Sequence, residues 1–255
     1  MMFSSIFGSI CNYIITIFIR NFGQLNDVGY FQAANTITNQ YIGLVFTAMS
    51  LDYFPRLSAV SSDNNQIREI VNRQSELVIL ILTPLAIALI IFAPLIIKIL
   101  LTDEFESIIP LLRLFGLGVI FKAISYPLGY ISFAKGDKKF FFYLEGIYSN
   151  IQTLILNCLF FYYLGIIGLG ISFIVSYILY SLIIRFLTGK RYLFRYEENV
   201  VKINFISIVL VSVSLAFTFS INGIFSYIII SIILIISLIY SFIELDKRLF
   251  ILKKK

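Results

Sequence analysis

The sequence contains no histidine and only two cysteines, so it lacks the residues on which most protein metal sites depend. Cys11 and Cys158 both lie inside apolar stretches, where a free cysteine behaves as a small hydrophobic side chain. The absence of histidine also excludes a Ser-His-Asp catalytic set. We therefore predict no disulfide framework, no metal and no cofactor.

Charged residues are also scarce, at 13% of the chain, whereas hydrophobic residues make up 59%. The mean hydropathy is +0.94, and soluble domains carry roughly one-quarter charged residues. Residues 77–101 and 224–243 form apolar runs that exceed the roughly 20 residues needed to cross a bilayer. The composition predicts a membrane protein. Because the basic residues are spread between apolar runs, the net charge of +6 does not predict nucleic-acid binding.

Enzyme signatures are missing as well. The sequence has no glycine-rich phosphate loop and no Asp-x-Asp pair of the kind that binds sugar nucleotides. No connection between apolar runs is long enough to hold a soluble catalytic domain. These absences favour a carrier or a partner helix bundle over an enzyme.

Eight apolar runs follow one another along the chain, and they are continuous, unlike the alternating segments of a membrane β-barrel. We therefore expect an all-α, polytopic membrane helix bundle with about eight transmembrane helices. The first run begins almost at the first residue, without a signal peptide, so we expect a part of a longer protein. The expected spans are residues 3–19, 29–54, 77–101, 107–134, 140–163, 166–187, 203–220 and 223–243.

Sixteen of the twenty basic residues lie in the connections after the second, fourth and sixth spans and in the C-terminal tail. The positive-inside rule then places both termini in the cytoplasm. Arg20, Lys98 and Arg113 lie near the opposite helix ends, where a long side chain reaches the interface.

Lys122 is different, because it lies near the middle of the span at 107–134, roughly 20 Å from either end. An ammonium at the centre of a membrane helix costs on the order of 3 kcal/mol and normally faces the bundle interior. Lys122 either faces a functional cavity or pairs with a carboxylate such as Glu145. Glu145 in turn is that partner, a protonatable group for ion coupling, or an interfacial residue.

Three prolines interrupt the expected helices. Pro84 and Pro94 lie in the third span and Pro127 in the fourth, five residues after Lys122. Such breaks are tolerated where neighbouring helices or a cavity satisfy the freed backbone groups, and they are common in transporters that bend. We expect hinges or kinks at these positions, with helix packing as the alternative.

Asp52 and Arg56 are four residues apart at the inner end of the second span. The spacing allows an ion pair on one helix face. This pair is either a solvated interfacial pair or part of a gate, in which case Asp52 is a candidate for ion coupling.

Two longer strings carry a resemblance. DVGYFQAANTITNQYIGLVFTAMSLDYFPRLSAVSSDNN (27–65) has a Gly-x-Phe-x-x-Ala start and a Pro-Arg-Leu-Ser end. Residues 126–180 contain a Gly-Asp-Lys-Lys turn and a Tyr-x-x-Gly-x-x-Gly turn. As a set, over roughly residues 3–195, these resemble polysaccharide transporters of the multidrug/oligosaccharidyl-lipid/polysaccharide (MOP) exporter superfamily, and O-antigen flippases in particular.

The resemblance implies a flippase of the bacterial inner membrane that moves an undecaprenyl-diphosphate-linked oligosaccharide for O-antigen or other surface polysaccharide assembly. Such transporters have two six-helix lobes around a central cavity. Residues 1–195 would be the second lobe, and residues 196–255 two additional helices with a basic cytoplasmic tail. The implied partners are the lipid-linked oligosaccharide, membrane lipid, a missing N-terminal lobe and other polysaccharide assembly proteins.

Under this resemblance Lys122 would bind the diphosphate, Tyr126 and Tyr130 would contact sugars, and Arg113 would lie near the outer mouth of the cavity. Three alternatives stay open. The cargo could be a drug or metabolite, the chain could be a membrane O-antigen polymerase or ligase, or it could be an inactive truncated fragment.

Overall fold

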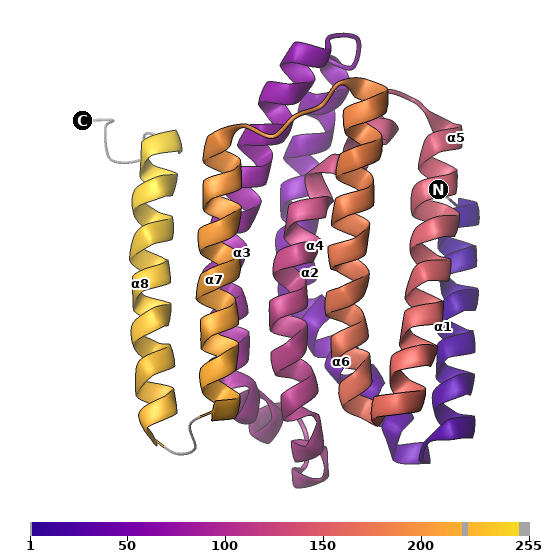
Figure 1. The fold of residues 1–255 in the computed structure, drawn as a ribbon, viewed down its shortest axis with the longest axis vertical. Helices are drawn as coiled ribbons and strands as arrows, with labels where there is room; N and C mark the ends of the chain where they lie inside the picture. The colour runs from indigo at the N-terminus through magenta and orange to yellow at the C-terminus, as the bar shows by residue number, and fades with distance from the viewer. Residues whose placement is uncertain (1, 221–223, 250–255) are drawn as a thin grey trace.

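The computed structural model describes residues 2–220 and 224–249, and these residues form a bundle of long helices (Figure 1). The predicted basic tail at Lys253–Lys255 lies outside the described residues. The elements in chain order are α1 (Met2–Phe22), α2 (Leu25–Ala59), α3 (Asn64–Leu100), the 3-10 turn η1 (Asp103–Ile108), α4 (Ile109–Ala134), α5 (Lys138–Phe141), the π-helical η2 (Phe142–Tyr148), α6 (Ser149–Tyr192), α7 (Glu198–Ser220) and α8 (Ile224–Leu249).

Over the residues that the structure describes, each of the eight expected spans coincides with helix, and α6 contains most of two of them. Six helical stretches of the described chain are long and apolar enough to cross a membrane, and the stretch Lys138–Tyr192 accounts for two spans. The prediction of an all-α membrane bundle is confirmed, with a helix count close to the expected eight.

The expected span at 29–54 forms most of α2, but α2 is not among those six apolar stretches. Its sequence carries Gln32, Asn35 and Asn39 between the apolar residues. A helix with this composition is poorly suited to face lipid on all sides, since carboxamides need polar partners. We therefore expect one face of α2 to line a polar space in the protein.

A hairpin divides α6 at Gly165, within the Tyr-x-x-Gly-x-x-Gly motif. Gly165 has φ 59° and ψ −143°, a conformation open essentially only to glycine. A Cβ atom on Gly168 would meet the Phe160 carbonyl oxygen at 2.0 Å. The two glycines thus allow the halves of α6 to turn back on one another, as the predicted break between residues 163 and 166 requires.

The segment before α6 is less regular than the expected helix at 140–163. It begins with the single turn of α5 and continues as the π-helical η2, which contains Glu145. Asp137 caps α5 by accepting a hydrogen bond from the Phe140 amide at 3.3 Å. Short π-helical segments are rare and occur frequently at functional sites, because the wider turn redirects side chains.

Helix α3 is the central element of the bundle. It packs against α2, α4, α7 and α8. Of its most apolar stretch of 18 residues, 61% is buried inside the protein. Fully buried side chains such as Ile79, Ile87 and Ile90 fill the space around it. In a membrane such contacts stabilise by van der Waals packing, because lipid tails are as apolar as the side chains themselves.

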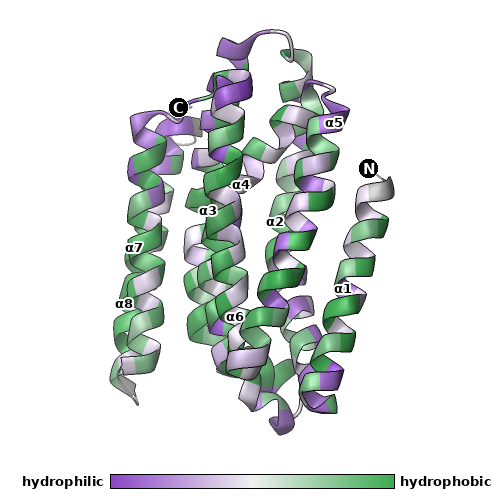
Figure 2. Cartoon of the chain, turned by 45° about the vertical axis from the view of Figure 1, so that its right-hand side comes forward, coloured by the Kyte–Doolittle hydropathy of each residue, from purple (hydrophilic) through white to green (hydrophobic). Residues whose placement is uncertain are grey.

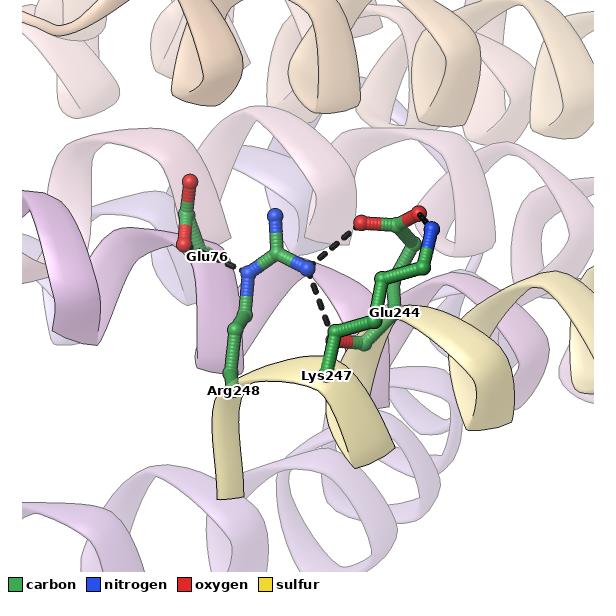
Figure 3. Close-up of polar contacts among 4 residues, drawn as sticks. All are labelled: Glu76, Glu244, Lys247 and Arg248. Carbon is green, nitrogen blue, oxygen red and sulfur yellow. Dashed lines mark hydrogen bonds and ion pairs between the residues drawn. The ribbon is translucent and has the colours of Figure 1, made fainter. Parts of the chain in front are cut away.

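Helix α8 lies at the edge of the bundle (Figure 1). An ion pair in its last turn joins it to α3. Arg248 Nε lies 2.6 Å from a carboxylate oxygen of Glu76 on α3, and Arg248 also pairs with Glu244 one turn earlier (Figure 3). Lys247 joins Glu244 at 2.8 Å. The side chains of Arg248 and Glu76 are only 17% and 13% exposed, so water screens this pair weakly.

The connections α2–α3, α4–α5 and α6–α7 lie at the same end of the bundle as the last turn of α8 (Figure 1). Hydrophilic residues gather at the two ends and hydrophobic residues fill the middle (Figure 2). The basic connections predicted from the sequence are therefore together in space.

Candidate functional site

Two cavities meet at Lys122. The first has a volume of about 300 Å³ and lies between α4, α6 and the segment around η2. The second, of about 530 Å³, lies between α1, α2, α4 and α6. Lys122, Ser149 and Tyr177 line both cavities. The lysine that the sequence singled out is therefore at the junction of the two spaces.

The Lys122 ammonium lies near two aromatic rings. Its Nζ lies 5.4 Å from the ring centre of Phe46 and 5.7 Å from that of Tyr177. Among the described residues no carboxylate forms an ion pair with it. Ring faces attract a cation, but they do not neutralise its charge. Lys122 thus remains a positive group available to an anion that enters either cavity.

Tyr126 and Tyr130 line the first cavity, as does Lys122. The Tyr126 hydroxyl donates to the Phe46 carbonyl at 2.5 Å, and the two tyrosine hydroxyl oxygens are 3.3 Å apart. The resemblance implied that these tyrosines lie in the cavity of Lys122, and all three residues line the first cavity.

Glu145 also lines the first cavity, but its carboxylate is held by Tyr180. The Tyr180 hydroxyl donates a hydrogen bond to it from the second half of α6. Gly129 leaves room for the carboxylate, since a Cβ atom there would lie 2.7 Å from Oε1. The alternative in which Glu145 pairs with Lys122 is therefore not the arrangement of this structure.

The second cavity has a lining that the sequence analysis missed. Its polar side chains are almost all carboxamides and hydroxyls, and Lys122 is the charged residue among them. Gln32, Asn35, Thr36 and Asn39 follow one another at helical spacing on α2, so they share one face. This i, i+3, i+4, i+7 pattern of three amides and a hydroxyl within a span was the signal that could have revealed the cavity.

Arg113 and Asp52 do not line these two cavities. The Arg113 guanidinium contacts the Ile90 carbonyl at 3.4 Å and the Tyr227 hydroxyl at 3.5 Å, between α3 and α8. Asp52 pairs with Arg56 at 2.5 Å, and its side chain is 73% exposed. The i, i+4 pair forms as its spacing allows, whereas Arg113, expected near the outer mouth of the cavity, lines neither cavity.

All three prolines lie inside helices that continue on both sides of them. Pro84 is buried in α3, Pro94 is partly exposed there, and Pro127 is buried in α4. The Tyr53 hydroxyl donates to the Pro127 carbonyl at 2.8 Å, which fastens α2 to α4 beside the first cavity. Hinge motion at the three prolines remains a prediction.

This arrangement suits reversible binding. An unpaired ammonium attracts an anion, and neighbouring hydroxyls and carboxamides offer hydrogen bonds without fixing a covalent partner. Within the described residues no group of three or more His, Cys, Asp or Glu side chains could hold a metal ion.

Comparisons with known proteins agree with the fold. Residues 1–110 match the family described as "Polysaccharide biosynthesis protein". The solved structure of the lipid II flippase MurJ in an inward closed conformation is similar over 97% of this chain and 53% of its own, with 18% identity and a TM-score of 0.72. A MOP superfamily transporter from Pyrococcus furiosus is similar over 85% of this chain and 50% of its own, with 18% identity and a TM-score of 0.52. No curated protein sequence gives a significant match.

The chain thus spans about half the length of the solved structures that it matches. At 18% identity these structures show the fold, and the family match covers residues 1–110 of the chain. Both findings agree with the resemblance seen in the sequence: this multi-pass membrane protein shares its fold with a lipid II flippase and with a MOP superfamily transporter, and its residues 1–110 match a polysaccharide biosynthesis family.

Proposed function

We propose that this chain provides one lobe of a flippase that moves an undecaprenyl-diphosphate-linked oligosaccharide across the bacterial inner membrane. The product would serve O-antigen or other surface polysaccharide assembly. A second lobe, on the same or another chain, would complete the central cavity, because the chain spans 53% of the MurJ structure. Residues 1–195 would form the lobe and residues 196–255 the additional helices.

Lys122 carries this proposal. Its ammonium has no carboxylate partner among the described residues and lies where two cavities meet. A diphosphate is negatively charged and needs a cation as its partner once it leaves water. A low-dielectric cavity strengthens the attraction between the diphosphate and the Lys122 ammonium. The lysine would bind through charge and hydrogen bonds without a covalent bond, so it could also release the lipid.

The same charges in the two cavities make a cationic drug a poorer ligand than an anion. The Lys122 ammonium repels a cation, and Glu145, the carboxylate that lines the first cavity, is already engaged by Tyr180. An organic cation that leaves water for this cavity would need an available counter-ion. The charge distribution therefore favours an anionic cargo.

The test uses cells whose own flippase gene is deleted and which express this chain, together with its second lobe if that is a separate chain. Lys122→Met should abolish surface polysaccharide, and Lys122→Arg should retain part of it. Lys98→Met removes an exposed lysine in the last turn of α3 and should have no effect. Full polysaccharide with Lys122→Met would refute the role of this lysine.

We also propose that both termini face the cytoplasm. The shared position of the basic connections in Figure 1 supports this orientation, because positive loops stay on the cytoplasmic side. With Cys11 and Cys158 replaced by alanine, a cysteine at Ser62 should react with an impermeant maleimide only after the cells are opened. A cysteine at Thr102 should react in intact cells, and the opposite pattern would invert the topology.

A further inference from the structure

We infer that the second cavity is a subsite for uncharged sugar units, next to the anion site at Lys122. This inference rests on the proposed function and adds to it which chemical class of glycan the lobe selects. It is carried by the lining of the cavity between α1, α2 and α6.

The polar groups of this lining match those of a neutral sugar. Asn35, Asn39 and Thr153 present two carboxamides and a hydroxyl, which together donate and accept hydrogen bonds. Sugar hydroxyls do both as well. A cavity of about 530 Å³ also falls within the range of about 300–1,000 Å³ typical of small-molecule sites.

Two buried hydroxyls in the lining have no protein partner. Thr38 on α2 and Ser176 on α6 are 4% and 5% exposed, and neither hydroxyl forms a hydrogen bond within the described chain. A buried polar group without a partner costs about 1–3 kcal/mol, and such groups are rare unless something else satisfies them. Both residues line the same cavity, Thr38 from α2 and Ser176 from α6, so a small side-chain rotation would turn either hydroxyl towards a ligand there.

The distribution of charge excludes an acidic sugar from this subsite. Lys122 is the cation that lines the second cavity, and the diphosphate of the proposed cargo would occupy it. A sugar carboxylate would then be desolvated among neutral amides without a counter-ion, which is unfavourable. Phe31, Phe115 and Phe173 add apolar surface for the C–H faces of a sugar ring.

The experiment measures binding to the full chain in lipid nanodiscs by microscale thermophoresis. Three probes are compared: undecaprenyl diphosphate alone, the same lipid carrying one N-acetylhexosamine, and the same lipid carrying one hexuronic acid. For the wild-type chain we expect the hexosamine probe to bind roughly tenfold more tightly than the bare lipid, which corresponds to one or two net hydrogen bonds. The hexuronic acid probe should bind no more tightly than the bare lipid.

The variant Asn35→Leu/Asn39→Leu should lose the tenfold gain and keep the affinity for the bare lipid. Gln40→Leu changes an exposed amide of α2 outside both cavities and should keep the gain. Thr38→Val preserves the side-chain shape but removes the hydroxyl, so this variant should lose part of the tenfold gain in affinity. Melting temperatures of all variants establish that they are folded.

The outcomes separate this inference from the proposed function. A sugar gain that persists in the double variant, or a hexuronic acid probe that binds as well as the hexosamine probe, overturns the neutral-sugar subsite. Lys122→Met should weaken all three probes by the same factor. If that variant changes none of them while the sugar gain is lost in the double variant, the subsite stands and the diphosphate role of Lys122 fails.

Discussion

Tyr180 donates a hydrogen bond to the carboxylate of Glu145, which joins the second half of α6 to the π-helical η2. Both residues line the first cavity together with Lys122. The cavity therefore contains one carboxylate and one ammonium that are not paired with each other. An anionic cargo can reach Lys122 without competing against a resident carboxylate.

Tyr180→Phe should destabilise the protein by about 1–3 kcal/mol, because it leaves the Glu145 carboxylate in the bundle without this donor. Thermal unfolding in detergent measures the change. Tyr177→Phe is a matched control, since Tyr177 lines the same cavity and its ring, which Phe would retain, is the part that faces Lys122. Equal melting temperatures for the two variants would contradict the importance of the Tyr180 bond.

Gly129→Ala should also destabilise, by about 1–3 kcal/mol, since the new methyl group forces the Glu145 carboxylate to move. Gly43→Ala serves as the control, because no atom lies within 4 Å of its added Cβ. An alanine in an uncrowded helix usually stabilises by about 0.4–1 kcal/mol. The expected opposite signs are read from melting temperatures, and a stabilised Gly129→Ala variant would show that the carboxylate is not confined.

The ion pair between Arg248 and Glu76 should couple α8 to α3 measurably. A double-mutant cycle with Glu76→Gln and Arg248→Met should give an interaction energy of about 1–3 kcal/mol, because both side chains are mostly buried. The lysine in the neighbouring pair of Lys247 with Glu244 is 63% exposed. Lys247→Met should therefore cost less than about 1 kcal/mol. A coupling energy near zero would mean that packing alone holds α8.

Asp137 should make stability depend on pH. Its side chain is 19% exposed, and it accepts hydrogen bonds from Arg191 at 2.6 Å, from the Tyr192 hydroxyl at 2.9 Å and from the Phe140 amide. Burial opposes ionisation, but the hydrogen bonds from Arg191, Tyr192 and Phe140 outweigh it and hold the pKa of the Asp137 carboxyl below its ordinary value.

A carboxyl with a lowered pKa in the folded state stabilises that state above its unfolded pKa, near 3.9. This stabilisation is lost as the pH falls through the lowered folded value. Asp137→Asn should therefore lower the free energy of unfolding at pH 7 by about 1–2 kcal/mol and unfold at a lower temperature than the wild type. The difference in stability between the variant and the wild type should become smaller below about pH 4. Asp52→Asn, in an exposed pair, should change little at either pH, and a pH-independent gap for Asp137→Asn would refute its ionic role.

The sequence sufficed for the membrane fold because the bilayer sets a length that apolar runs must match. It also sufficed to single out Lys122, since a charge far from either helix end cannot reach water. It was insufficient for Arg113, whose distance from the cavity depends on which face of α4 meets α3 and α8. The π-helical η2 was likewise hidden, because its sequence reads as an ordinary helix.

The sequence by itself determined which segments are helices, how the basic residues alternate between connections, and that one lysine lies deep in a span. Only the tertiary structure decided what that lysine faces. Residues from α1, α2 and α6 converge on the second cavity, and Tyr180 rather than Lys122 engages Glu145. Hydrophobic periodicity reports where a helix is buried, whereas the partners of a polar side chain depend on the rotation and packing of several helices at once.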